Sequence, residues 1–213
     1  MKFDRKTLLL YAVTDRAWLA GRALAGQVEE ALLGGATFVQ LREKELPWDA
    51  SLAEAFRIRE VTSRFHVPFV INDNIELALA SGADGAHVGR RDRAVSEARA
   101  LLGAGRILGA SVQTAEQAIR AERDGADYLG VGAVFPTSSK PDADSVSLQT
   151  LRDICACVSI PVVAIGGITE HNVMRLAGSG IAGIAVISAL FSGPDAAKAA
   201  RSLRRRCGEA AFG

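Results

Sequence analysis

Short apolar runs rich in β-branched residues alternate with longer amphipathic stretches along the whole chain. The apolar runs predict eight strands, at residues 8–15, 38–42, 69–73, 85–89, 107–112, 128–132, 162–166 and 182–188. The amphipathic stretches predict helices at residues 23–33, 49–64, 75–81, 93–102, 115–124, 148–157, 170–177 and 194–206. Eight strand–helix units without a break in composition predict one α/β domain over residues 1–213, a (β/α)8 TIM barrel.

Four glycines occur at similar points of this alternation. Each of them lies between a predicted helix and the next predicted strand, and the strands that follow them are the second, fourth, sixth and eighth. They are Gly35, Gly82, Gly125 and Gly180. Glycine adopts the left-handed conformation that ends a helix at a lower cost than other residues. The four positions therefore predict helix caps and indicate a repeat of two strand–helix units.

The composition agrees with a barrel and excludes several classes of partner. Hydrophobic residues make up 49% of the chain and aromatic residues only 6%, so the core is expected to consist of Ala, Val, Ile and Leu. The 25 basic and 24 acidic residues balance, which indicates neither nucleic acid nor a membrane surface as a partner. Four arginines near the carboxyl terminus are expected on a solvated final helix.

The three cysteines and the amino-terminal residues bear on the cellular location. The cysteines form neither a disulfide framework nor a zinc motif, so we interpret them as reduced thiols of a cytoplasmic protein. The apolar run near the amino terminus is too short for a membrane span and lacks the pattern of a signal peptide. The sequence leaves the oligomeric state open, a homo-oligomer included.

Polar residues follow nearly every predicted strand, where TIM barrels have their active sites. One such residue would be ordinary surface polarity, but a full set at one rim predicts a site. The set comprises Thr14, Asp15, Gln40, Arg42, Lys44, Asn72, Asp73, Asp92, Ser111, the segment PTSSK, Gly166, Gly167, Ile187 and Ser188.

Two carboxylates in this set indicate a metal. Asp73 and Asp92 follow adjacent predicted strands, whose spacing of ~4.8 Å brings both within reach of one ion. Mg²⁺ is commonly held by one or two carboxylates together with substrate phosphates. The alternative for Asp92 is a cap on the helix predicted from residue 93. The three histidines are too scattered for a zinc site, and we interpret them as structural.

Other members of the set indicate two anion sites. Gly166 and Gly167 precede a predicted helix, and Ser188 ends the next strand, which is the usual position of a phosphate site in these barrels. Arg42, Lys44 and Lys140 supply cations for a second and more highly charged anion. The sequence thus predicts a monophosphate pocket beside a magnesium–diphosphate pocket.

Between residues 11 and 188 the chain resembles the thiamine phosphate synthase family. The resemblance rests, in order, on the motifs YAVTD, VQLREK, VINDNIELALASGADGAHVG, GASVQT, GADYLGVGAVFPTSSK, PVVAIGGIT and GIAVIS. It implies a reaction that joins hydroxymethylpyrimidine diphosphate to thiazole phosphate, giving thiamine phosphate and diphosphate. It also implies a dissociative, Mg²⁺-assisted mechanism.

The resemblance assigns roles to individual positions. Asp73 and Asp92 would hold Mg²⁺. The pyrimidine diphosphate would bind to Gln40, Arg42, Lys44, Asn72, Ser111 and Lys140, of which Lys44, Ser111 and Lys140 are expected to take part in catalysis. The thiazole phosphate would bind to Thr137, Ser139, Gly167, Ile187 and Ser188. The loop at residues 135–147 is expected to act as a lid that excludes water.

Three positions depart from the family pattern, and two other functions remain open. The family commonly has threonine at Ser139, glutamine at Arg90 and glycine near Ser147. A thiazole tautomerase would keep the monophosphate pocket but would not need Asp73, Asp92 and Lys44. A non-catalytic protein that binds phosphate ligands is the other alternative, since sequence alone does not distinguish binding from turnover.

Overall fold

A computed structural model describes residues 4–90, 92–137 and 145–212. Within these residues, eight parallel strands close into a barrel in which each strand pairs with its neighbours in sequence and β8 pairs with β1. The strands are β1 (Leu10–Val13), β2 (Phe38–Leu41), β3 (Phe69–Asn72), β4 (Gly85–Val88), β5 (Ile107–Val112), β6 (Tyr128–Val131), β7 (Val162–Ile165) and β8 (Gly183–Val186). The predicted TIM barrel is confirmed.

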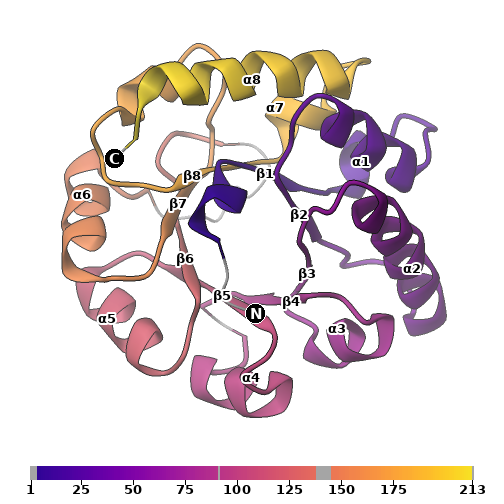
Figure 1. Ribbon diagram of the computed structural model, residues 1–213, viewed down its shortest axis with the longest axis horizontal. Coiled ribbons are helices and arrows are strands. Elements are labelled where there is room, and N and C mark those ends of the chain that lie inside the picture. Colours follow the sequence, from indigo (N-terminus) through magenta and orange to yellow (C-terminus); the bar gives the residue numbers. More distant parts are fainter. Residues whose placement is uncertain (1–3, 91, 138–144, 213) are drawn as a thin grey trace.

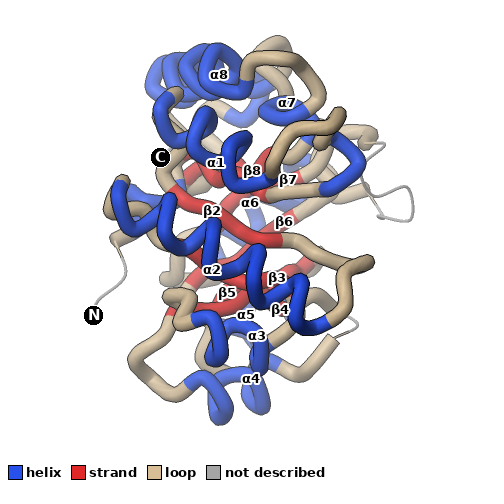
Figure 2. Tube along the Cα trace, turned by 90° about the vertical axis from the view of Figure 1, so that its right-hand side faces the viewer, coloured by secondary structure: helices blue, strands red, loops and turns tan. Residues whose placement is uncertain are grey.

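Helices surround this barrel on the outside (Figures 1 and 2). The α-helices are α1 (Leu24–Leu33), α2 (Trp48–Arg64), α3 (Ile75–Ser81), α4 (Val95–Leu102), α5 (Ala115–Arg123), α6 (Leu148–Cys157), α7 (Ser188–Phe191) and α8 (Ala196–Ala210). Three short 3-10 helices are η1 (Arg5–Leu8), η2 (Arg16–Trp18) and η3 (Val173–Leu176). The helix α8 lies against α1, so the last helix closes the ring with the first.

The prediction of a helix over residues 170–177 was wrong, because only the short η3 forms there. A side chain of this segment forms hydrogen bonds with the backbone just before it. The Asn172 side chain accepts from the Thr169 N–H at 2.8 Å and donates to the Gly167 carbonyl oxygen at 2.8 Å. Bonds of this kind compete with helix formation. The short helix α7 was not predicted, and β1 starts at Leu10 because η1 occupies the residues before it.

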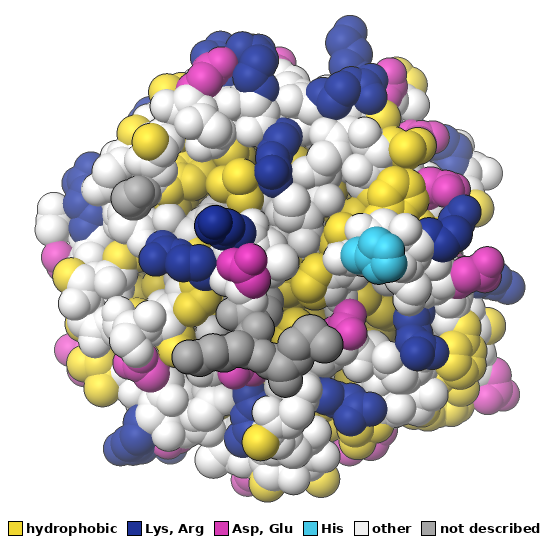
Figure 3. Space-filling model, viewed as in Figure 1, with side chains coloured by type: hydrophobic (Ala, Val, Ile, Leu, Met, Phe, Trp, Pro, Cys, Tyr) yellow, Lys and Arg dark blue, Asp and Glu magenta, His cyan; other side chains and the backbone are white. Residues whose placement is uncertain are grey.

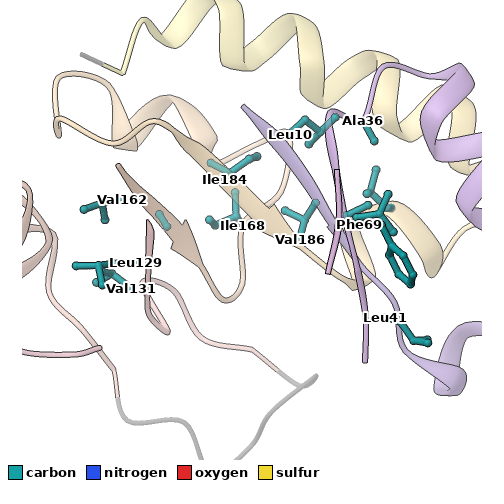
Figure 4. Close-up of a cluster of buried hydrophobic side chains, with 14 of the residues drawn as sticks. Leu10, Ala36, Leu41, Phe69, Leu129, Val131, Val162, Ile168, Ile184 and Val186 are labelled. Atoms are coloured by element: carbon teal, nitrogen blue, oxygen red, sulfur yellow. The ribbon is translucent and has the colours of Figure 1, made fainter. Parts of the chain in front are cut away.

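Strand residues alternate between two cores. One set points outward and packs against the helices, and ten side chains of this outer core are labelled in Figure 4. The other set points into the barrel and contains Tyr11, Val13, Phe38, Val70, Tyr128, Val163 and Ala185, together with Leu8. The 3-10 helix η1, which carries Leu8, lies across the amino-terminal end of the barrel in the centre of Figure 1. The open end is therefore the one at which the strands finish.

The glycines at the four predicted junctions adopt positive φ angles. These angles are 102° at Gly35, 67° at Gly82, 101° at Gly125 and 84° at Gly180. At Gly82 the left-handed conformation ends α3, and its N–H bonds the carbonyl oxygens of Ala78 and Leu79. Gly35 and Gly125 directly follow the C-cap residues of α1 and α5, so the predicted helix ends are confirmed at three of the four glycines. Gly180 lies three residues beyond Ala177, the C-cap of η3, and therefore does not cap a helix.

The face of the molecule that Figure 3 shows carries side chains of both charges. Basic and acidic side chains are interspersed on this face, which carries the amino-terminal end of the barrel. None of the helices in the described ranges is long and apolar enough to span a membrane.

Candidate active site

A cavity of about 370 Å³ opens at the carboxyl ends of the strands, and all eight strands or the residues just after them line it. The lining includes nine predicted site residues: Gln40, Arg42, Lys44, Asn72, Asp73, Asp92, Ser111, Thr137 and Ile187. It also includes residues that we had not placed in the site, among them Tyr11, His87 and Gln113. The strand ends thus bring most of the predicted set to one cavity.

Asp73 and Asp92 lie together in this cavity. The Asp73 carboxylate accepts from the Gly89 N–H at 3.2 Å and from the Asn72 side-chain amide at 2.5 Å. Burial is the largest of the effects that raise the pKa of Asp73 to about 6, and a hydrogen bond and charge repulsion from Asp92 add to it. The Gly89 N–H and the Lys44 ammonium act in the opposite direction. Two carboxylates held this close disfavour being charged together unless a cation joins them.

The backbone at Gly89 is shaped for this pair. A Cβ atom at Gly89 would lie 2.3 Å from Asp92 Oδ2 and 3.6 Å from Asp73 Oδ1, so a side chain there would fill the space beside both carboxylates. Asp73 itself adopts a left-handed conformation with φ 60°, which is uncommon for a residue other than glycine. The local backbone thus directs two carboxylates to one point of the cavity.

Asp92 does not cap the following helix. The helix α4 begins at Val95, its N-cap residue is Ala94, and no side chain caps it. Asp92 instead makes a backbone hydrogen bond to the Gly89 carbonyl oxygen at 3.3 Å. The alternative interpretation of Asp92 as a helix cap was therefore wrong.

A salt bridge and a tight turn hold the cations beside the carboxylates. Arg42 bonds Asp15 Oδ2 at 2.6 Å through Nη1, so the end of β1 orients the guanidinium that follows β2. The Glu43 Oε1 atom accepts from the backbone N–H groups of Lys44, Glu45 and Leu46, at 2.9, 2.9 and 3.2 Å.

The other carboxylate oxygen of Glu43 pairs with Arg16. Burial raises the pKa of Glu43, but the backbone N–H groups of the turn and the Arg16 guanidinium outweigh burial and hold it below its usual value. Glu43 therefore stays charged and fixes the turn. Arg42 and Lys44, the residues before and after Glu43, are held in place with it. Sequence reasoning had given Glu43 no role.

Hydrogen bonds link the floor of the cavity across the barrel. His87 bonds Ser111 Oγ at 2.9 Å through Nε2 and Tyr128 Oη at 3.0 Å through Nδ1. Tyr128 Oη lies 2.8 Å from Tyr11 Oη, which accepts from Gln40 Nε2 at 2.5 Å. His87 thus lines the site and contacts a predicted site residue, beyond the structural role that we had assigned to it.

The glycines after β7 lie against the loop that follows β6. Gly166 and Gly167 have φ angles of 100° and 63°. A Cβ atom at Gly166 would lie 2.5 Å from Ala133 Cβ, and one at Gly167 would lie 2.2 Å from the Pro136 carbonyl oxygen. Both residues therefore permit close packing of the two loops. Gly166 lines the cavity, whereas Gly167 and Ser188 lie outside its lining residues.

The remaining predicted residues belong to the loop between β6 and α6. Ser139 and Lys140 lie outside the described residues, as does the middle of the predicted lid. The described ends of this loop are anchored: the Val146 N–H donates to the Ala133 carbonyl oxygen at 2.8 Å, and Ser147 Oγ caps α6 by accepting from the Thr150 N–H at 3.0 Å. Serine at position 147 thus supplies a helix cap.

A second cavity of about 270 Å³ lies beside the turn at Glu43. Its lining includes Trp48 and Leu77 together with Lys44 and Asn72, which also line the first cavity. The two cavities therefore share one wall.

The sequence and the fold both match characterised families. The model of the family described as thiamine monophosphate synthase matches residues 10–190. A thiamine-phosphate synthase of Clostridium tetani is 49% identical over 91% of this chain and 93% of its own length. That of Chloroflexus aurantiacus is 46% identical over 92% of this chain and 90% of its own length.

Solved structures agree with these relatives. A thiamine phosphate pyrophosphorylase from Pyrococcus furiosus superposes with a TM-score of 0.89 at 40% identity, covering 97% of this chain and 98% of that one. One from Bacteroides thetaiotaomicron, with a TM-score of 0.64 at 19% identity, shares the fold. The match of the family model over most of the chain, together with relatives nearly half identical to it, shows that the chain belongs to the thiamine monophosphate synthase family.

Proposed function

We propose that the large cavity binds 4-amino-2-methyl-5-hydroxymethylpyrimidine diphosphate beside thiazole phosphate and joins them into thiamine phosphate. Membership of the family makes the chain a transferase of thiamine biosynthesis. The observation that carries the detailed assignment is the carboxylate pair of Asp73 and Asp92, which lies in one cavity with the cations Arg42 and Lys44.

The residues present fit a magnesium ion. No cluster of three or more His, Cys, Asp or Glu side chains suited to a metal occurs in the part of the chain that the structure describes. Two carboxylates alone suit Mg²⁺, which takes its remaining ligands from substrate phosphates and water. The glycine at position 89 leaves open space next to both carboxylates. Bound between Asp73 and Asp92, Mg²⁺ would neutralise charge on the diphosphate.

The side chains of the cavity suit a dissociative reaction. The C–O bond to diphosphate breaks, and the electron pair of this bond leaves with the diphosphate. The resulting pyrimidine cation is stabilised by its own amino group, and the thiazole nitrogen then attacks it. Arg42 and Lys44 of the cavity would bind the leaving group and stabilise the charge that develops on it, and Lys140 is proposed to act with them. Gln40, Asn72 and Ser111 orient the pyrimidine, so no side chain needs to act as a nucleophile.

We propose that the thiazole phosphate occupies the side of the cavity formed by the ends of β7 and β8. Ile165 and Ile187 give this side an apolar wall beside Gly166. Backbone N–H groups near Gly167 and Ser188 would bind the phosphate, and Thr137 and Ser139 are proposed as further ligands. The sharp bends at Gly166 and Gly167 are consistent with this arrangement.

Diphosphate release from the two substrates, measured with and without Mg²⁺, tests the proposal. We expect release only when both substrates and Mg²⁺ are present. A thiazole tautomerase would instead isomerise the thiazole phosphate without Mg²⁺, and a binding protein would bind both ligands without turnover. Either result would overturn the proposed reaction.

A further inference from the structure

Five polar side chains form a continuous hydrogen-bonded chain across the floor of the cavity. They come from five strands, in the order Gln40 of β2, Tyr11 of β1, Tyr128 of β6, His87 of β4 and Ser111 of β5. The four donor–acceptor distances are 2.5, 2.8, 3.0 and 2.9 Å in that order. The chain therefore connects Gln40 with Ser111, two of the three residues proposed to orient the pyrimidine.

The middle of this chain is buried and uncharged. The exposed fraction is 1% for Tyr11 and 0% for Tyr128, and burial raises the pKa of both phenols well above the ordinary value. Both hydroxyls therefore keep their hydrogen atoms. Gly109 makes room for the link to His87, since a Cβ atom there would lie 2.2 Å from Tyr128 Cζ and 2.4 Å from His87 Nδ1.

A hydroxyl group that accepts one hydrogen bond of such a chain donates the next, so the chain has a direction. Gln40 Nε2 can only donate, so Tyr11 accepts from it and donates to Tyr128, which then donates to His87 Nδ1. A neutral imidazole that accepts at Nδ1 carries its hydrogen at Nε2 and donates it to Ser111 Oγ. The Ser111 hydroxyl hydrogen is thereby left for the cavity.

The same direction sets the other end of the chain. With Nε2 of Gln40 donating to Tyr11, the carbonyl oxygen of the amide is the atom that can accept from a ligand. The opposite direction would need the Gln40 amide turned over and the His87 hydrogen on Nδ1. In that state Gln40 would offer a donor to the ligand and Ser111 an acceptor.

We propose that Tyr11, Tyr128 and His87 are positioning residues that couple Gln40 to Ser111 and thereby select an aminopyrimidine against its oxo analogue. This inference rests on the proposed function. A 4-aminopyrimidine offers an exocyclic N–H to the Gln40 carbonyl and a ring nitrogen to the Ser111 hydroxyl. The 4-oxo analogue offers the reverse pattern, a carbonyl acceptor and a ring N–H, which requires the whole chain to reverse.

The first experiment measures the state of His87 in the ligand-free protein. The chain has three histidines, and variants that lack them one at a time assign their signals in ¹⁵N NMR. We expect the Nε2–H tautomer at His87 in the wild type and a mixture of tautomers in Tyr128→Phe, which keeps the ring but loses the hydroxyl. An Nδ1–H tautomer in the wild type, or no change in Tyr128→Phe, would overturn the inference.

The second experiment measures selectivity by calorimetry with the monophosphate esters of the aminopyrimidine and of its 4-oxo analogue. We expect the wild type to prefer the amino ligand by about tenfold or more, since a mismatched ligand leaves buried polar groups unpaired. In Tyr128→Phe this preference should fall to about threefold or less, because Tyr11 can then donate to the Gln40 carbonyl. An unchanged preference would count against coupling.

Two further variants make this result specific. Ser81→Ala removes a different buried hydroxyl, which donates to the Leu77 carbonyl oxygen at 2.7 Å in α3, and should leave the preference unchanged. Tyr11→Phe breaks the chain at another link and provides the same test if Tyr128→Phe does not fold. If the wild type released no diphosphate, the proposed reaction would fail, while the His87 tautomer would still test the coupling.

Discussion

Replacing Asp92 by asparagine should stabilise the metal-free protein and at the same time slow the enzyme. The Asp73 carboxyl has a pKa of about 6, raised first by burial and then by its hydrogen bond to Asp92 and by the charge of Asp92. A raised pKa means that the folded state favours the protonated form. The associated stability is complete below the ordinary value of 3.8 and is lost as the pH rises through 6.

The size of this effect follows from the shift. A change of about two pKa units corresponds to at most about 3 kcal/mol at 1.36 kcal/mol per unit. Burial accounts for the largest part, and Asp73 is partly exposed, so solvent screening reduces the share that Asp92 contributes to about 1 kcal/mol. At pH 8 without metal, Asp92→Asn should therefore raise the melting temperature by about 2–4 °C. Below about pH 4 the two proteins should be equally stable.

The rate should respond in the opposite way. Removing one group that stabilises a developing anion commonly costs on the order of 100-fold in rate, and we expect at least this loss of diphosphate release with Mg²⁺. Asp195→Ala is the matched control, because Asp195 does cap a helix, accepting from the Lys198 N–H at 2.7 Å. This control should lose about 1 kcal/mol of stability and keep its magnesium dependence.

Two results would refute this reasoning. If Asp92→Asn turned over at the wild-type rate with an unchanged magnesium requirement, the assignment of the metal would be wrong. If the metal-free variant were less stable than the wild type at pH 8, the two carboxylates would not repel each other. Thermal unfolding in EDTA from pH 4 to 8 and the diphosphate assay measure the two quantities separately.

Three further substitutions test other parts of the cavity. Gly167→Val should weaken binding of thiazole phosphate at least about tenfold more than binding of pyrimidine diphosphate in calorimetry, and equal losses would count against separate anion sites. Glu43→Ala should raise the KM for pyrimidine diphosphate about tenfold by freeing the turn that carries Lys44, whereas Glu43→Gln, which keeps an acceptor oxygen, should lose less. Gly109→Ala should cost about 1–3 kcal/mol in urea unfolding, because its Cβ would overlap Tyr128; an unchanged midpoint would contradict the tight packing.

The order of the elements was predictable because the apolar runs are short and regularly spaced. Three elements have the predicted bounds: the strand at residues 107–112 and the helices at 75–81 and 148–157. The segment at 170–177 was not predictable in this way, since the Asn172 side chain folds back and binds the backbone of Gly167 and Thr169. In the sequence alone, Asn172 fits the pattern of an amphipathic helix as a solvent-exposed polar position, so the pattern gives no sign of these hydrogen bonds.

The candidate site was predictable at its rim but only in part at its floor, where Gln40 and Ser111 were predicted and Tyr11, Tyr128 and His87 were not. Asp73, Asp92 and Lys44 follow strands, so a rule about strand ends finds them. Tyr11 and His87 lie within strands, and that rule passes over them. The signal that could have found them is alternation, since residues two apart on a strand face the same side and Tyr11 and His87 are inward-facing.

Alternation also explains why the barrel is filled at one end and hollow at the other. Large inward-facing side chains, among them Phe38 and Tyr128, pack together near the amino-terminal end with ring centroids 5.7 Å apart. Inward positions further along the neighbouring strands hold glycine, and a Cβ atom at Gly130 would already lie 3.2 Å from His87 Cε1. Polar groups can therefore line the cavity because the positions beside them have no side chain. The buried tyrosines that complete the core from below also supply the hydrogen bonds that orient the cavity floor, so packing and ligand selection depend on the same residues.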